Sequence, residues 1–352
     1  MYGALRRVLF GLDAERAHHV ALRGLRIVQR SEVLRATIAG AKPDARLRSR
    51  IFGIDVPAPL GMAAGFDKGA EVYNALLALG FGHVEVGTVT PRPQPGNEGK
   101  RVERHPEHAA LVNRLGFPGP GMVVAGTRLR ERPPLGVVGA NVGPNKTTAP
   151  DLVVEDLRAA AMAVAPHVGF VAINVSSPNT PGLRELQEPA AVARFVGSVL
   201  IALDVVRARR PVLVKLHPDA EDAQLVAVAK AAVGAGASGV IATNTTRARP
   251  PGFEKAIEGG LSGAPLRDRA RKAIAALHHG LGRETPIVGV GGIFTAVDAW
   301  GHIRAGASLV QTYTGFIYEG PRMPVKVHRG LVDLLDAAGL DRIGEAVGSA
   351  SH

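Results

Sequence analysis

Eight short and nearly continuous apolar runs recur along the chain, and a helical pattern follows each of them. They predict strands at residues 60–63, 83–89, 136–141, 170–175, 212–216, 239–243, 287–290 and 309–313. Such runs are typical of parallel strands that are buried on both faces and joined by crossover helices. Eight units in roughly 300 residues favour an α/β fold of the (β/α)8 TIM-barrel type over a doubly wound sheet. We expect residues 46–57 to form a hairpin that closes the bottom of the barrel.

The first 50 residues differ from the rest in charge. They hold 11 Lys and Arg against 4 Asp and Glu, which is +7 of the formal net charge of +11. Basic character confined to one end does not provide a face large enough for DNA, and only 4% of residues are aromatic, too few for base stacking. We therefore divide the chain into a helical extension over residues 1–42 and a barrel domain over residues 43–352.

The extension contains an amphipathic helix that begins after Asp13, a suitable N-cap. At 100° per residue its apolar side carries Ala14, Ala17, Val20, Ala21, Leu25 and Val28, and its basic side carries Arg16, Arg23, Arg26 and Arg30. Such a helix either lies in an anionic membrane surface or packs on the barrel, and we favour the membrane. The apolar stretches are too short or too charged for a signal peptide or a spanning helix.

Polar residues stand where the expected strands end, and the carboxyl ends of barrel strands share one rim. They are Lys68, Thr88, Asn141, Asn174, Ser177, Lys215, Thr243, Asn244 and Tyr313. Each alone is explained as a cap or a solvated side chain, but together they predict a pocket for a planar ligand rich in hydrogen-bonding groups. Glycines at 291–292, 315 and 263 follow or flank the last strands, where barrels bind phosphate.

Other kinds of site have little support in the sequence. Cysteine is absent, which excludes disulfides, thiolate-bound metals and a cysteine base. His105 and His108 lie in an expected Pro-containing loop without a third ligand, so we expect no metal site. Lys215 follows a strand and is also compatible with the Schiff-base lysine of a barrel aldolase.

Seven motifs occur in the order found in dihydroorotate dehydrogenases, and the chain resembles that family from about residue 10 to residue 330. The longest is Asn-Val-Ser-Ser-Pro-Asn-Thr-Pro-Gly-Leu-Arg at 174–184, and the others lie at 63–68, 87–97, 113–117, 214–216, 242–245 and 260–263. Within the family the chain is similar to the membrane-associated, quinone-reducing class 2, which has an N-terminal helical extension and a serine base. The soluble class uses a cysteine base, which this chain lacks.

The resemblance implies an FMN-containing barrel that oxidises (S)-dihydroorotate to orotate in pyrimidine (UMP) biosynthesis. The flavin contacts that it implies are Ala64, Gly65, Phe66, Asp67, Lys68, Thr88, Asn141, Asn174, Lys215, Thr243, Gly263, Gly292, Tyr313 and Thr314. The implied substrate contacts are Lys68, Asn113, Arg114, Leu115, Gly116, Phe117, Asn174, Asn179, Asn244 and Thr245, with Ser177 as the base. Thr180 and Phe117 would flank the path by which the proton leaves.

The resemblance also implies an acceptor and a location. His18, Arg104 and Tyr313 match the quinone site, with Arg101 as a nearby alternative to Arg104. The acceptor would be ubiquinone or menaquinone, and the protein would attach peripherally to the cytoplasmic side of the cell (inner) membrane. A soluble acceptor such as fumarate or NAD, and a catalytically dead scaffold, are the alternatives to this interpretation.

The chemistry of the reaction suits these residue types. Removing two hydrogens from a dihydropyrimidine takes a proton from one carbon and a hydride from its neighbour, so a flavin and a base are both needed. Asparagine amides supply paired donors and acceptors for the ring. Lys68 suits the substrate carboxylate, and Lys215 suits negative charge on a reduced flavin.

Overall fold

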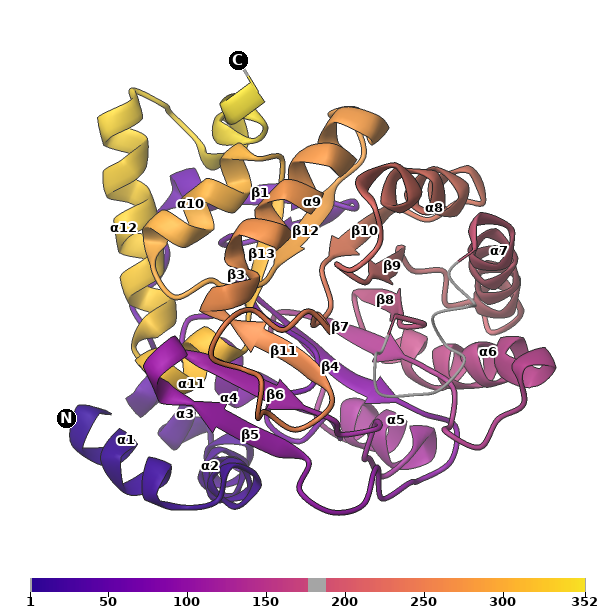
Figure 1. Cartoon of the computed structure of the whole chain (residues 1–352), viewed down its shortest axis with the longest axis horizontal. Coiled ribbons are helices and arrows are strands. Elements are labelled where there is room, and N and C mark those ends of the chain that lie inside the picture. The colour runs from indigo at the N-terminus through magenta and orange to yellow at the C-terminus, as the bar shows by residue number, and fades with distance from the viewer. Residues whose placement is uncertain (1, 177–187, 352) are drawn as a thin grey trace.

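The computed structural model of the chain describes residues 2–176 and 188–351. Eight parallel strands close a barrel in the order β10-β12-β13-β3-β4-β7-β8-β9, which confirms the predicted TIM barrel (Figure 1). The strands are β3 (Leu60–Met62), β4 (His83–Val89), β7 (Val137–Val142), β8 (Phe170–Ile173), β9 (Val212–Leu216), β10 (Gly239–Ala242), β12 (Ile287–Val290) and β13 (Leu309–Thr312). Three of the predicted strands match in full, and the ends of the others differ by one or two residues.

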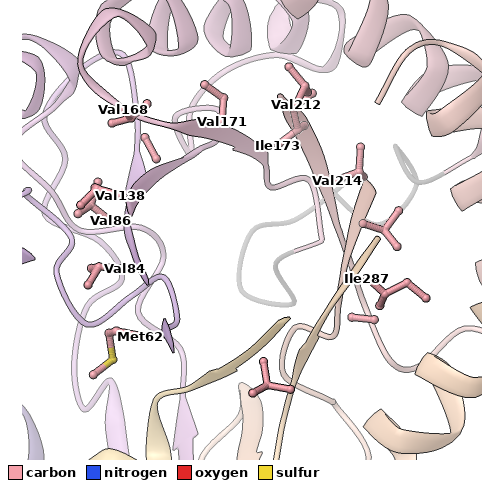
Figure 2. Packing of buried hydrophobic residues seen from close by; sticks show 14 of the residues in the cluster. Met62, Val84, Val86, Val138, Val168, Val171, Ile173, Val212, Val214 and Ile287 are labelled. Atoms are coloured by element: carbon pink, nitrogen blue, oxygen red, sulfur yellow. The ribbon is translucent and has the colours of Figure 1, made fainter. Parts of the chain in front are cut away.

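Helices surround the barrel and bury the outward side chains of its strands. They are α4 (Tyr73–Ala78), α5 (Met122–Glu131), α6 (Val153–Val164), α7 (Pro189–Val205), α8 (Asp222–Gly234), α9 (Arg267–Leu281), α10 (Ala296–Arg304), α11 (Thr314–Glu319) and α12 (Met323–Ala338). Short 3-10 turns occupy Ala45–Leu47, Pro150–Leu152, Ala165–His167, Ala264–Leu266, Ile343–Ala346 and Ser349–Ser351. Figure 2 shows the valines of this core, among them Val84 and Val86 of β4, which alternate with residues that point into the barrel.

A hairpin closes the bottom of the barrel, as predicted for residues 46–57. Strands β1 (Ser49–Ile51) and β2 (Ile54–Val56) pair antiparallel, and the turn between them places Gly53 at a φ of 76°. Val56, Ile51 and Phe52 pack on a separate apolar cluster that includes Phe170 and Leu213. Because this end is filled with apolar side chains, polar chemistry is left to the opposite rim.

A three-stranded antiparallel sheet that the sequence analysis did not predict lies outside the barrel. Its order is β11-β6-β5, with β5 (Val102–His105), β6 (Ala110–Asn113) and β11 (Gly260–Gly263). The loop expected around His105 and His108 is correct only in part, since His105 ends β5, whereas Pro106–His108 form the 3-10 turn that joins β5 to β6. Each strand is only four residues long, too short for its alternation to stand out, and the pairing joins distant segments.

The N-terminal extension folds as α1 (Tyr2–Gly11), α2 (Ala14–Arg30) and α3 (Glu32–Ile38). The Asp13 carboxylate accepts from the N–H groups of Glu15 and Arg16, so the predicted cap is confirmed. Helix α2 lies on α4 and β5 beside the barrel (Figure 1). Among the described residues no helix combines the length and the apolar character that crossing a membrane requires.

The two sides of α2 differ in part from the prediction. Gln29 is buried, and its Oε1 accepts from the N–H groups of Asn74 and Ala75 at 2.8 and 3.1 Å, which ties α2 to the start of α4. Arg26, expected on the basic side, forms an ion pair with Glu71 of the barrel. Helical periodicity alone does not reveal this partner, because Glu71 lies on a segment outside the helix.

Candidate active site at the carboxyl rim of the barrel

One cavity lies where the barrel strands end, and we call it the rim cavity. It brings together most of the flavin and substrate residues expected from the sequence. Those that line it are Ala64, Gly65, Lys68, Thr88, Asn113, Leu115, Gly116, Phe117, Asn174, Lys215, Thr243, Asn244, Thr245, Gly263, Gly292, Tyr313 and Thr314. They come from segments spread over some 250 residues of sequence, so only the closed barrel makes them neighbours.

Hydrogen-bonded amides form one wall of the rim cavity. Asn141 Oδ1 accepts from Thr88 Oγ1 at 2.6 Å and from Asn174 Nδ2 at 3.0 Å. Asn174 Oδ1 in turn accepts from Ser176 Oγ at 3.1 Å, and Asn244 Nδ2 donates to the same hydroxyl at 3.0 Å. Each amide is fixed in orientation by its neighbours, so the wall presents a defined pattern of donors and acceptors.

Two ammonium groups make the rim cavity suited to anions. Lys68 donates to the Gly65 carbonyl at 2.6 Å, and burial lowers the pKa of Lys68 to about 8. Lys215 points inward from β9 and is 5% exposed. At the ends of β12 and β11, Gly292 and Gly263 have φ values of 71° and 99°, which favour glycine and bring the backbone to the cavity.

Several expected residues lie near the rim cavity without lining it. Asn141 stands behind Thr88 and Asn174, and the Arg114 guanidinium turns to the Glu98 carbonyl. Asp67 is buried and accepts from two N–H groups before α4, and burial raises its pKa to about 6. Phe66 lines a different cavity. Ser177, Asn179 and Thr180 lie outside the described residues.

The second cavity, the helix tunnel, lies between α1, α2 and the barrel and encloses about 630 Å³. His18, Arg104 and Tyr313, the three residues expected at a quinone site, all line it. The other lining residues are mostly apolar and include Leu5, Leu9, Phe10, Ala21, Leu25 and Val28. Lys68 and Tyr313 line both cavities, so the helix tunnel and the rim cavity share a wall.

The chain matches the sequence profile described as dihydroorotate dehydrogenase over residues 46–335. It is 46% identical to the dihydroorotate dehydrogenase (quinone) of Roseiflexus sp., with 99% of this chain and 98% of that one covered. The corresponding protein of Mycobacterium marinum is 42% identical, with 99% and 97% covered. This chain belongs to the dihydroorotate dehydrogenase family. The family consists of flavin-dependent oxidoreductases, which gives no support to the aldolase interpretation of Lys215.

Solved structures agree with this assignment. The dihydroorotate dehydrogenase of Eimeria tenella in complex with ferulenol has a TM-score of 0.89 at 32% identity, covering 98% of this chain and 99% of that one. The ligand-free form has a TM-score of 0.87 and covers 95% of this chain. The coverage includes the N-terminal helices as well as the barrel, so the dihydroorotate dehydrogenase architecture extends over both cavities.

Aromatic rings connect the helix tunnel to the rim of this dihydroorotate dehydrogenase fold. The rings of His18 and Phe66 pack in a T-shaped arrangement with centroids 5.2 Å apart, and those of Phe66 and Tyr313 do so at 6.0 Å. Burial holds the pKa of His18 well below its ordinary value, so its imidazole is neutral near pH 7. Burial also raises the pKa of Tyr313 to about 12, which keeps the hydroxyl protonated as a donor.

Both arginines considered for the quinone site line the helix tunnel, and both bind groups of the N-terminal extension. Arg101 pairs with Glu15 at the start of α2. Arg104 donates to the carbonyls of Leu9 and Phe10 at 3.1 and 3.2 Å and to that of Leu12, at the end of α1. The structure therefore assigns each arginine a role in holding the extension against the barrel.

Three residues of these sites were not identified from the sequence. Glu15 lies in the tunnel, but an acidic residue in a first helical turn is ordinary. Glu85 and Gln311 lie inside strands and hydrogen-bond to each other at 2.8 Å. A carboxylate within a seven-residue run expected to be buried on both faces was the signal that would have found Glu85.

Proposed function

We propose that this chain oxidises (S)-dihydroorotate to orotate in pyrimidine biosynthesis, with FMN in the rim cavity and a membrane quinone as electron acceptor. One observation carries the proposal: a polar cavity with two ammonium groups shares a wall with an apolar tunnel under the N-terminal helices. The relatives at 42–46% identity are named dihydroorotate dehydrogenase (quinone), which supports the same activity and acceptor.

The residues of the rim cavity fit FMN. Gly263, Gly292 and Thr314 line the side of the cavity suited to a phosphate, which backbone N–H groups would bind there. Thr88, Asn174 and Lys215 would hold the ring through hydrogen bonds and charge. When bound, the flavin accepts the hydride that leaves one ring carbon of the substrate.

The chain itself binds the substrate and removes the proton. Lys68 would pair with the carboxylate of dihydroorotate, and Asn113, Asn174 and Asn244 would meet its ring amides. Ser177 is the proposed base that takes the proton from the neighbouring carbon. A serine hydroxyl is a weak base, so its own proton must leave along a relay, which we place beside Phe117 and Thr180.

The helix tunnel would hold the quinone. Its apolar lining suits a prenyl tail, and the neutral His18 and the protonated Tyr313 are hydrogen-bonding groups for a quinone carbonyl at the inner end. Arg104 closes the wall beside Phe10, with its guanidinium 4.8 Å from the ring centroid. Asn179 would complete the substrate contacts in the adjoining rim cavity.

The outer surface of the extension supports peripheral attachment to a membrane. Val8, Ile27 and Val33 are 68%, 63% and 74% exposed, which is a high exposure for large apolar side chains. Exposed arginines lie among them, including Arg7 and Arg23. Apolar side chains flanked by basic ones favour the surface of an anionic membrane, here the cytoplasmic side of the cell membrane.

An absorption spectrum of the purified protein tests this function. We expect flavin bands that are lost on anaerobic addition of dihydroorotate and return on addition of a quinone. Steady-state rates with quinone should exceed those with fumarate or NAD. A protein that binds no flavin, a flavin that dihydroorotate does not reduce, or a preference for a soluble acceptor would each contradict the proposal.

A further inference from the structure

A buried carboxylate that the proposed reaction does not use lies inside the barrel. Glu85 of β4 has no exposed surface, and its two oxygens accept from Asn141 Nδ2 at 2.6 Å and from Gln311 Nε2 at 2.8 Å. In the described part of the chain no cation forms an ion pair with it. Burying a carboxylate without a cation is costly, so its retention among apolar strands calls for a role.

The carboxylate fixes the direction of both amides. Both oxygens of Glu85 accept from amide NH2 groups, so Asn141 and Gln311 each turn the NH2 group towards Glu85 and the carbonyl oxygen away. For Asn141 the oxygen then faces the hydroxyl of Thr88 and the amide of Asn174, from which it accepts. Glu85 therefore sets the orientation of the amides that form this wall of the rim cavity.

Glu85 orients the amide of Gln311 in the same way, but the carbonyl oxygen of Gln311 differs from that of Asn141 in its hydrogen bonding. Gln311 is fully buried on β13 and lines the rim cavity, and its Oε1 has no hydrogen-bond partner in the part of the chain that the structure describes. A buried carbonyl oxygen without a partner is destabilising unless a ligand or a mobile side chain supplies a donor.

We propose that Gln311 is a further residue of the flavin site, an acceptor for an N–H donor, and that Glu85 is the positioning residue that sets this polarity. The proposal rests on the proposed function for the identity of the ligand. The donor is either a ring N–H of FMN or the ammonium of Lys215, which lines the same cavity. With a ring N–H as the donor Gln311 contacts the flavin directly, and with Lys215 as the donor it orients the ammonium that Lys215 presents to the flavin.

The substitution Glu85→Gln separates polarity from packing. The introduced amide would have one acceptor and one donor group in place of two acceptors, so one neighbouring amide must turn over. Turning Asn141 would break two hydrogen bonds, whereas turning Gln311 breaks none at its oxygen. We therefore expect Gln311 to present NH2 to the cavity in place of its carbonyl oxygen.

We expect Glu85→Gln to weaken FMN binding to the apoprotein roughly 10- to 100-fold, the usual effect of leaving a buried polar group unpaired. The thermal midpoint of the apoprotein should change little, and the bound flavin should show shifted absorption maxima. Asp222→Asn, the same change at an ion pair with Arg269 outside the barrel, is the matched control and should bind FMN normally. Wild-type FMN affinity in Glu85→Gln would overturn the proposal.

A double-substitution cycle tests the route through Gln311. In a Gln311→Met background Glu85→Gln should change FMN affinity less than about threefold, because the amide that it redirects is gone. An undiminished effect would overturn the role of Gln311. The same cycle with Lys215→Met identifies the donor: an effect that persists assigns a ring N–H of FMN, and one that disappears assigns Lys215. Both outcomes support the acceptor role.

Two further results keep the test decisive. If Glu85→Gln does not fold, a crystal structure of the FMN-bound wild-type protein should place Gln311 Oε1 within hydrogen-bond distance of a donor, and Nε2 in that place would overturn the proposal. Failure of the proposed function looks different. If wild-type protein binds FMN but dihydroorotate does not reduce that FMN, the proposed substrate is wrong, and the FMN affinities of the variants can still be measured.

Discussion

Replacing Arg104 by alanine should loosen α1 from the barrel and impair the reaction with quinone. The guanidinium donates to three carbonyls at the end of α1 and lies over the Phe10 ring. In the variant the freed carbonyls can hydrogen-bond to water instead. Each hydrogen bond to Arg104 therefore contributes only about 0.5 kcal/mol at this partly exposed site. With about 0.5 kcal/mol from the cation–π contact, docking of α1 loses about 2 kcal/mol. This corresponds to a roughly 30-fold larger population with α1 undocked.

Two half-reactions and a proteolysis experiment measure the consequence. Anaerobic reduction of the flavin by dihydroorotate should keep its wild-type rate, since Arg104 lies outside the rim cavity. The apparent KM for a long-tailed quinone should rise by up to roughly 30-fold, and trypsin should cleave after Arg6 and Arg7 faster. Arg210→Ala, which removes a donor to the Val168 carbonyl elsewhere, is the control. Wild-type quinone kinetics together with a wild-type cleavage rate in Arg104→Ala would refute the reasoning.

Four further perturbations test the proposed sites. Ser177→Ala should retain FMN but slow flavin reduction in stopped flow by roughly two to four orders of magnitude, and an unchanged rate would reject Ser177 as the base. Burial lowers the pKa of Lys68 to about 8, so the ammonium is lost above that pH. The apparent KM for dihydroorotate should be constant below about pH 8 and rise above it, whereas a flat wild-type profile to about pH 9.5 contradicts the carboxylate role. Gly24 lines the tunnel, and a Cβ added there would meet no described atom within 4 Å. Gly24→Leu should therefore raise the KM for long-tailed but not for short-tailed quinones. Gly197→Leu is equally open in α7 and serves as its control, and equal quinone kinetics in the two variants would count against the tunnel. Deleting residues 1–40 should spare flavin reduction and impair turnover of a long-tailed quinone, and retained turnover would exclude the extension from the quinone site.

The elements predicted well are those whose signals are local. Strands β4, β9 and β12 match the prediction in full, because each is a short apolar run bounded by turn residues. The Asp13 cap was equally readable, since an N-cap depends only on the three residues that follow it. The barrel follows from counting such runs, and closure then brings the strand ends to one rim.

The elements and contacts that were missed depend on distant partners. Strand β11 pairs with β6, about 150 residues earlier, and neither carries a pattern long enough to recognise alone. Phe66, Asp67 and Lys68 are consecutive in one motif, yet Phe66 lines the tunnel, Asp67 caps the segment before α4, and Lys68 lines both cavities. A motif indicates that such residues matter, but the backbone path decides which way each one points.

The sequence by itself determined the fold class, the capped basic helix of the extension and the kinds of polar group available at the rim, because propensity and periodicity act over a few residues. Only the tertiary structure decided that Lys68 and Tyr313 line both cavities and that Arg26 faces Glu71. It also decided that Glu85 orients amides from two other strands. These relations arise because barrel closure brings side chains from distant parts of the chain within hydrogen-bond distance of one another. A short stretch of sequence contains no information about the distance between such side chains.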